Sequence, residues 1–266
     1  MKLGILAVSF GTTHLDTLEK TIQAAEADLA AAFPNAKVYR AFTSGMVRSR
    51  LMDKFDIHVD SVSEALARMR ADGVEQAVIQ TTLLLPGEEF DLLRREALHH
   101  AGAMRAALGL PLLWDDSDCS AIIDILDNAY PVGDDEILLL MGHGTRHGAN
   151  DLYVRLSLCM EMRRGERMAL CTIDGTPTFE DAIARLKAQP RRRVRVAPLL
   201  LVAGDHAKND MAGEKPDSLR RRLEREGFQV SCEVRGLGEI PAVRQRLVSR
   251  ARAAYEALNA GCGCAV

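Results

Sequence analysis

Two histidines and an aspartate stand where three apolar runs of the sequence end: His143 after 136–141, Asp174 after 169–173 and His206 after 194–202. If these runs are parallel strands, their carboxyl ends meet at one edge of a sheet, which brings the three side chains together. Two imidazoles and a carboxylate form a facial site for a divalent first-row metal. Such a site leaves coordination positions open, as exchange or catalysis requires.

The first half of the chain carries corresponding turns with different side chains. The pairs are Phe10 with His143, Ser44 and Gly45 with Asp174 and Gly175, and Glu89 with His206. Glu89 could therefore accept protons or a metal ion. Simpler interpretations stay open. Each histidine could merely form a hydrogen bond at a turn, and Glu89 could merely be a first-turn glutamate that the helix dipole favours.

Apolar runs alternate with amphipathic segments along the chain, which is typical of parallel strands joined by crossover helices. We predict strands over 3–9, 37–42, 76–85, 112–114, 136–141, 169–173, 194–202 and 229–234. The predicted helices are 14–32, 60–71, 88–108, 119–129, 149–163, 178–187, 215–226 and 241–258.

The order of elements occurs twice, and the segment 131–135 has the Pro, Gly and Asp composition of a linker. We therefore predict two α/β domains, each a four-stranded parallel sheet flanked by helices. The first covers 1–130 and the second, which carries the metal ligands, covers 131–258. The last helix, 241–258, could pack back on the first domain.

Composition and charge exclude several classes of protein. A net charge of −3 over 266 residues gives no basic field for gripping nucleic acid. No apolar run approaches the ~18 residues of a membrane span, and the apolar start is too short for a signal peptide, so we expect a soluble, cytoplasmic protein. Neither a dinucleotide-binding fingerprint nor a P-loop follows a strand.

The six cysteines have spacings that match no zinc ribbon or disulfide framework. Residues 259–266 are predicted to form a flexible tail. Its Cys262 and Cys264 could capture a soft metal, but a frayed terminus without an essential role is the simpler interpretation.

Five blocks of sequence resemble a known family. They are Val8–Thr12, Arg40–Met46, Met141–Gly144, Leu201–Met211 and Gly236–Glu239. In these blocks the chain resembles the anaerobic cobaltochelatases of cobalamin biosynthesis, which belong to the class II chelatases and act on sirohydrochlorin. The similarity extends over nearly the whole chain.

The resemblance implies two flavodoxin-like, chelatase-like domains with a cleft between them that receives a flat modified tetrapyrrole. His143 and His206 match metal-binding residues, His143 also matches the proton acceptor, and Glu89 matches a glutamate of the cleft. Asp174 is expected as the third metal ligand, at a position where a member of the family has glutamate. The residues expected to contact the substrate are Ser9, Phe10, Gly11, Thr12, Ser44, Gly45, Leu85, Pro86, Gly87, Gly142, Gly144, Gly204 and Asp205.

The expected reaction is insertion of Co2+ into sirohydrochlorin with loss of two protons, catalysed by His143 and Glu89 without an organic cofactor. Arg48 and Arg50 follow the turn at Ser44 and Gly45, and their guanidinium groups suit a substrate with several carboxylates. Phe10 is expected to form an apolar wall against the macrocycle. The alternatives are insertion of Fe2+ into the same substrate, or a carrier of tetrapyrrole or metal without turnover. The resemblance also predicts a homo-oligomer, with no nucleic-acid or membrane partner.

Overall fold

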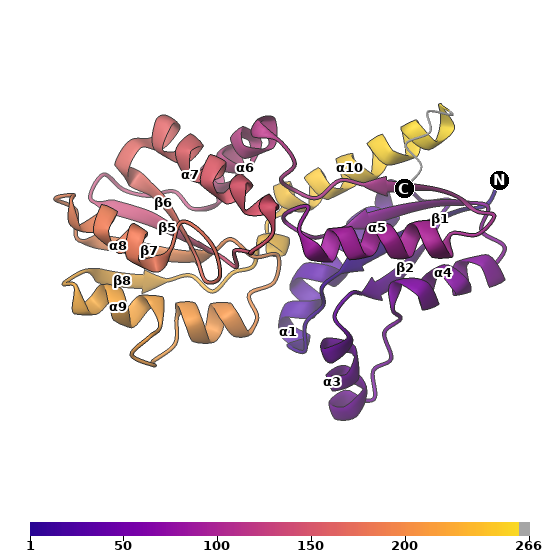
Figure 1. Ribbon diagram of the computed structural model, residues 1–266, viewed down its shortest axis with the longest axis horizontal. Helices are drawn as coiled ribbons and strands as arrows, with labels where there is room; N and C mark the ends of the chain where they lie inside the picture. Colours follow the sequence, from indigo (N-terminus) through magenta and orange to yellow (C-terminus); the bar gives the residue numbers. More distant parts are fainter. Residues whose placement is uncertain (261–266) are drawn as a thin grey trace. The chain divides into compact units, whose positions relative to one another are not determined.

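The computed structural model describes residues 1–260, so Cys262 and Cys264 of the predicted flexible tail lie outside the described residues. The chain divides into two compact units. Unit 1 contains Met1–Trp114 and the chain from Pro241 on, and unit 2 contains Asp115–Ile240. Each unit is a parallel sheet with helices on both faces, which confirms the predicted fold class (Figure 1).

The sheet of unit 1 has the strand order β2-β1-β3-β4. Its strands are β1 (Leu3–Ser9), β2 (Lys37–Phe42), β3 (Gln76–Thr81) and β4 (Arg105–Gly109). One face packs on α4 (Val62–Ala71) and α5 (Glu88–His100), and the other on α2 (Ala24–Ala32) and α10 (Pro241–Asn259). The remaining helical segments are α1 (Leu15–Leu18), η1 (Glu19–Gln23) and α3 (Gly45–Phe55).

The sheet of unit 2 repeats this order as β6-β5-β7-β8. Its strands are β5 (Glu136–Gly142), β6 (Met168–Thr172), β7 (Arg193–Pro198) and β8 (Gln229–Cys232). One face packs on α8 (Phe179–Lys187), η4 (His206–Met211) and α9 (Leu219–Arg225). The other elements are α6 (Asp116–Ala129), η2 (Gly148–Asn150), α7 (Asp151–Arg164), η3 (Gly165–Arg167) and η5 (Leu237–Glu239).

The first strand of each unit is central in its sheet. Every residue of β5 is buried, as expected for a continuous apolar run paired on both sides. The chain leaves β5 toward β6 on one side and returns to β7 on the other. This reversal makes the carboxyl ends of β5 and β7 a ligand-binding position in open α/β sheets. The same holds for β1 and β3 in unit 1.

The division between the units differs from the predicted boundary at 130/131. Helix α6 belongs to unit 2, where Arg163 of α7 donates to the Ser120 carbonyl at 2.8 Å and pairs with Asp124. Helix α10 belongs to unit 1, because its buried Val248 and Ala251 pack with Ile5 and other residues of the sheet.

The fourth strand of unit 1 also differs from the prediction. Helix α5 ends at His100, Gly102 takes a φ of +61°, and β4 begins at Arg105. The segment 103–108 is rich in alanine and otherwise contains only methionine, arginine and leucine, so its residue types favour helix, but pairing with β3 overrides that weak preference. Residues 112–114 are therefore not a strand, although the Leu112 and Leu113 N–H groups still bond to carbonyls of 83 and 84.

Helix α3 and segment η4 were not predicted, nor were the short segments η3 and η5. Helix α3 begins where the Ser44 hydroxyl accepts from the Val47 N–H, and it buries only Leu51, although Val47, Leu51 and Phe55 have helical spacing. Segment η4 is a single π-helical stretch, too short for a periodic pattern. Among the described residues, the longest apolar helices fall short of what a membrane crossing demands.

Candidate metal site

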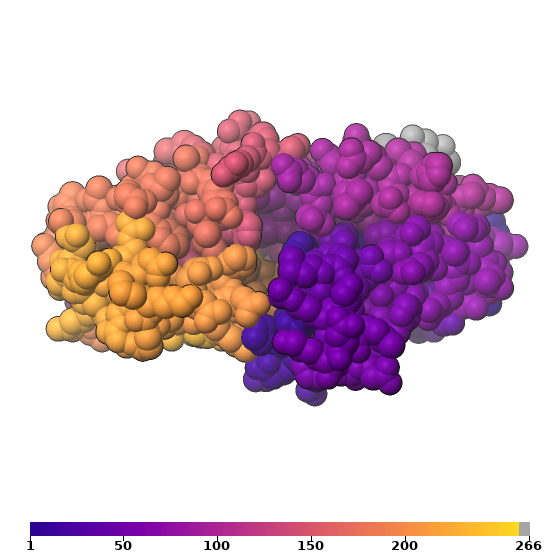
Figure 2. Space-filling model, turned by 60° about the horizontal axis from the view of Figure 1, so that its bottom comes forward, coloured from indigo at the N-terminus to yellow at the C-terminus, as the bar shows by residue number. Residues whose placement is uncertain are grey.

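His143 and His206 are brought together in unit 2 from the ends of two different strands. His143 follows β5 directly, and His206 begins η4 after β7. The ring centroids are 4.8 Å apart and the rings are nearly perpendicular. Both side chains reach the surface, with 46 % of the His206 side chain exposed. Figure 2 shows the orange stretch of residues near 200–225, which includes η4, as surface of unit 2.

Each imidazole is held through its Nδ1 atom. His143 Nδ1 lies 3.0 Å from the Gly144 carbonyl oxygen, and His206 Nδ1 lies 2.6 Å from Asp210 Oδ2. A carbonyl or carboxylate oxygen only accepts, so both Nδ1 atoms carry a proton, and in its neutral form each ring keeps a lone pair on Nε2. Metal-binding histidines typically have this arrangement, in which the outer hydrogen bond fixes tautomer and ring orientation.

Asp210 was not among the predicted site residues. It lies four residues after His206 on the same helical segment, and this spacing places two side chains on one face. The sequence signal was the pattern His-x-x-x-Asp in the segment after a strand. The pair is half exposed, with 48 % of the Asp210 side chain accessible.

Asp174 is joined to His143 through the backbone. Its N–H donates to the His143 carbonyl at 2.8 Å. Gly144 lies against the same turn, with φ of +80°, and a Cβ there would lie 2.5 Å from the Gly175 nitrogen. No three His, Cys, Asp or Glu side chains between residues 1 and 260 are grouped to hold a metal. Asp174 as the third ligand therefore stays a prediction.

The matching turns of the two units share their hydrogen bonds. The Ser44 N–H donates to the Phe10 carbonyl at 3.2 Å, as the Asp174 N–H does to His143. The Thr12 hydroxyl accepts from the His14 N–H, and the Thr145 hydroxyl accepts from the His147 N–H, both at 3.1 Å. Phe10 and His143 therefore occupy equivalent positions in the two units, and so do Ser44 and Asp174.

The predicted substrate residues of unit 1 lie in the turns after β1, β2 and β3. Phe10 is 46 % exposed, whereas Ser9 is buried and accepts from the Thr82 hydroxyl at 2.8 Å. Gly11 has a φ of +103°, and a Cβ there would lie 2.5 Å from Phe42 Cδ2. The other predicted residues also lie between a strand and the helix that follows it. Gly45 begins α3, and the half-buried Leu85, Pro86 and Gly87 precede α5. In unit 2, Gly204 and Asp205 precede η4.

Glu89 stands in the first turn of α5, and its Oε2 atom is buried without a hydrogen-bond partner in the described structure. Thr43 Oγ1 and Arg48 Nε, which lie after β2, share this property. Buried polar side-chain atoms without partners are rare, and a bound ligand is one way to satisfy them. All three atoms lie in the segments that follow β2 and β3.

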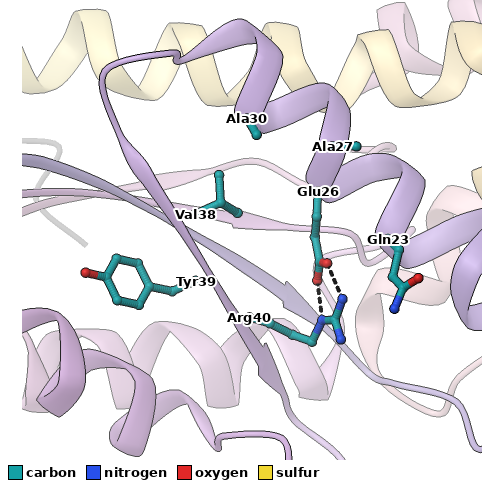
Figure 3. A pocket seen from close by; sticks show the side chains of 7 residues that line it. All are labelled: Gln23, Glu26, Ala27, Ala30, Val38, Tyr39 and Arg40. Atoms are coloured by element: carbon teal, nitrogen blue, oxygen red, sulfur yellow. Dashed lines mark hydrogen bonds and ion pairs between the residues drawn. The ribbon is translucent and has the colours of Figure 1, made fainter.

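A surface hollow of about 470 Å³ elsewhere in unit 1 lacks these properties (Figure 3). It lies between α2 and β2, and its two charges face each other. Arg40 Nε donates to Glu26 Oε1 at 2.6 Å, and a second bond joins the same groups, so the pair satisfies itself. The two charged groups of the hollow are therefore already paired with each other.

Comparison with protein families matches residues 3–256 to the family described as cobalt chelatase (CbiK). The sirohydrochlorin cobaltochelatase of Salmonella typhimurium is 36 % identical over 261 residues, 97 % of each chain. The sirohydrochlorin cobaltochelatase CbiKC of Nitratidesulfovibrio vulgaris is 32 % identical over 263 residues, covering 97 % of this chain and 92 % of that one.

Solved structures of similar fold include SirB from Bacillus subtilis with Fe3+, with a TM-score of 0.67 at 14 % identity. A second is the sirohydrochlorin chelatase SirB of Bacillus subtilis subspecies spizizenii in complex with cobalt, with a TM-score of 0.63 at 14 % identity. Each match covers 98 % of both chains. At this identity the likeness concerns the fold.

Proposed function

The chain belongs to the cobalt chelatase family and is a metal chelatase, and from this premise we propose that it inserts Co2+ into sirohydrochlorin through His143 and His206. The observation that carries the assignment of residues is the histidine pair. Two rings at 4.8 Å, each held through Nδ1, present two free Nε2 lone pairs at the ligand-binding edge of the sheet.

A site with only two protein nitrogens suits a metal ion that must be transferred to the substrate. Structural sites for first-row metals are closed by a full set of protein ligands, whereas this pair leaves most coordination positions to water and to the pyrrole nitrogens of the substrate. Co2+ can then exchange protein nitrogens for macrocycle nitrogens one at a time. The carboxylate of Asp174 is proposed as a further ligand, because its backbone is bonded to His143.

Insertion releases two protons from the macrocycle as the divalent ion enters, so the charge of the substrate is unchanged. His143 Nε2 cannot bind the metal and a proton together. Once Co2+ passes to the macrocycle, that lone pair is free to accept a proton. The Asp210 carboxylate accepts from His206 Nδ1 and holds that ring in orientation.

Glu89 is proposed as the second proton acceptor. Its Oε2 atom has no hydrogen-bond partner in the described structure, so a carboxylate oxygen is available. Arg48 Nε and Thr43 Oγ1 are proposed to bind a carboxylate of the substrate, because a guanidinium and a hydroxyl both donate to such a group. The exposed ring of Phe10 is proposed as an apolar contact for the flat macrocycle.

The choice of cobalt over iron rests on the relatives, since the ligand types suit both ions. A cytoplasmic location, a homo-oligomeric state and the lack of an organic cofactor stay predictions from the sequence.

The proposal is tested by anaerobic assay of the purified protein with sirohydrochlorin and either Co2+ or Fe2+, followed by the visible spectrum. We expect many turnovers with Co2+ and a higher kcat/KM than with Fe2+. A higher kcat/KM with Fe2+ would make the chain a ferrochelatase. Stoichiometric retention of the ligand, with metallation at the background rate, would make it a carrier.

A further inference from the structure

His143 is exposed at a tight turn, so its position depends on what holds the backbone beneath it. The ring of Tyr153, on α7, lies directly under Gly142: a Cβ on that glycine would lie 2.5 Å from Tyr153 Cε1 and 3.0 Å from its hydroxyl oxygen. The backbone N–H groups of His143 and Gly144 lower the pKa of this hydroxyl, so they lie close to its oxygen. Tyr153 therefore packs against the backbone that carries the imidazole.

Burial raises the pKa of Tyr153 to about 12, while the two backbone N–H groups act in the opposite direction. The side chain is only 2 % exposed and neutral at physiological pH. A neutral buried hydroxyl can accept from the turn without adding a charge beside the histidine. Its role is therefore geometric.

Asn150 holds the next part of the same turn. Its Oδ1 accepts from the Thr145 N–H at 3.2 Å, and its Nδ2 donates to the Thr176 carbonyl at 3.0 Å and hydroxyl at 2.9 Å. Gly175 packs on this amide so closely that a Cβ would overlap with Oδ1. Asn150 thus ties the turn after β5, which carries His143, to the turn after β6, which carries Asp174.

We infer that Asn150 and Tyr153 are positioning residues that hold the His143 turn in its metal-binding geometry. They stand three residues apart, so they share one face at the start of α7. Neither contacts the metal or the substrate in this account. The inference rests on the proposed function, because it concerns the site assigned there.

The pair matters because insertion requires accurate placement of one nitrogen. Misplacement of a reacting group by about 1 Å can cost on the order of 100-fold in rate. Loss of an outer-shell partner of a metal ligand typically costs about 10–100-fold in metal affinity or activity. Y153F keeps the ring under Gly142 and removes only the hydroxyl, and N150A removes both bridges of a partly exposed side chain.

The experiment compares Y153F, N150A and N150D with matched controls. Y130F removes another buried tyrosine hydroxyl of unit 2, which donates to the Arg235 carbonyl at 3.3 Å. N128A removes an asparagine that bonds only its own helix, at the Asp124 carbonyl. The readouts are the absorption spectrum and dissociation constant of bound Co2+, kcat and KM for sirohydrochlorin, and near-UV circular dichroism to show that each variant is folded.

We expect Y153F and N150A to lower kcat by about tenfold or more and to change the Co2+ spectrum, with KM for sirohydrochlorin within about twofold. N150D keeps the acceptor for Thr145 and should fall between N150A and the native chain. The inference is overturned if folded Y153F and N150A match Y130F and N128A in spectrum and kcat. H143A separates the two proposals: if it stays active, the proposed site is wrong, and if it alone is inactive, only the positioning role fails.

Discussion

Removing the Asp210 carboxylate tests how the metal-binding form of His206 is fixed. In the native chain Asp210 Oδ2 lies 2.6 Å from His206 Nδ1 and keeps the proton there. In D210A the ring can rotate, and its proton can move to Nε2, where it blocks the lone pair that binds metal. We therefore expect weaker Co2+ binding without loss of either imidazole.

The expected loss follows from the exposure of the pair. Outer-shell partners of metal ligands contribute about 10–100-fold to affinity. Water can replace an acceptor that is half exposed, as both side chains are here, and it screens the charge. The lower end of the 10–100-fold range therefore applies. D210A should raise the Co2+ dissociation constant about tenfold, which is a loss of ~1.4 kcal/mol of binding free energy. D210N keeps a neutral acceptor of roughly half the strength and should cost about threefold.

The assay is a competition titration of Co2+ against a chromophoric chelator, with thermal unfolding recorded for every variant. The matched control is E96A, because Glu96 is four residues before His100 on α5, with its Oε2 atom 3.5 Å from Nε2. E96A should bind Co2+ like the native chain. In an H206A background, D210A should cause almost no further loss, since its effect passes through that ring.

Equal Co2+ affinity for D210A, E96A and the native chain would refute the reasoning. A full tenfold further loss in the H206A background would refute it as well, because Asp210 would then act on the metal by another route.

Three further predictions concern the turn, the second proton acceptor and alkaline pH. E89Q should lower kcat by about 100-fold and leave Co2+ affinity unchanged, because Glu89 is proposed to accept a proton; equal kcat by steady-state assay contradicts this. G144A should lower the free energy of unfolding in urea by about 1–3 kcal/mol, since its Cβ would meet the Gly175 nitrogen at 2.5 Å; an unchanged midpoint contradicts the close approach. Burial raises the pKa of Tyr130 and Tyr153 to about 12 against ~10 when unfolded, so unfolding should become easier as pH rises from ~10 to ~12. The double variant Y130F/Y153F should lose part of this slope, and an identical slope contradicts it.

Strand ends were the most predictable part of the molecule. The run 136–142 is uniformly buried, so its apolar letters identified β5 and placed His143 at its end. Matching the halves by element also paired Phe10 with His143 correctly, as the shared hydrogen bonds confirm. Parallel sheets make such predictions possible, because the position of a residue along the chain determines the edge on which it lies.

Other features depended on contacts that no local pattern reveals. The alanine-rich segment before Gly109 favours helix by residue type, and only its pairing with β3 makes it β4. Tyr153 and Asn150 look like ordinary residues at a helix start, since their role arises from a turn that folds over them. Asp210 was the exception, because its spacing from His206 could have been read as a helical pair.

The central claim is that the histidine pair of unit 2 binds Co2+ during insertion, and a single-turnover measurement tests it most directly. Excess protein is mixed anaerobically with sirohydrochlorin and Co2+, and metallation is followed by stopped-flow absorbance for the native chain, H143A and H206A, with H99A as the control. We predict a fall of at least ~100-fold in the insertion rate for H143A and H206A and a native rate for H99A, all with native circular dichroism. Insertion by folded H143A and H206A at the native rate would contradict the account.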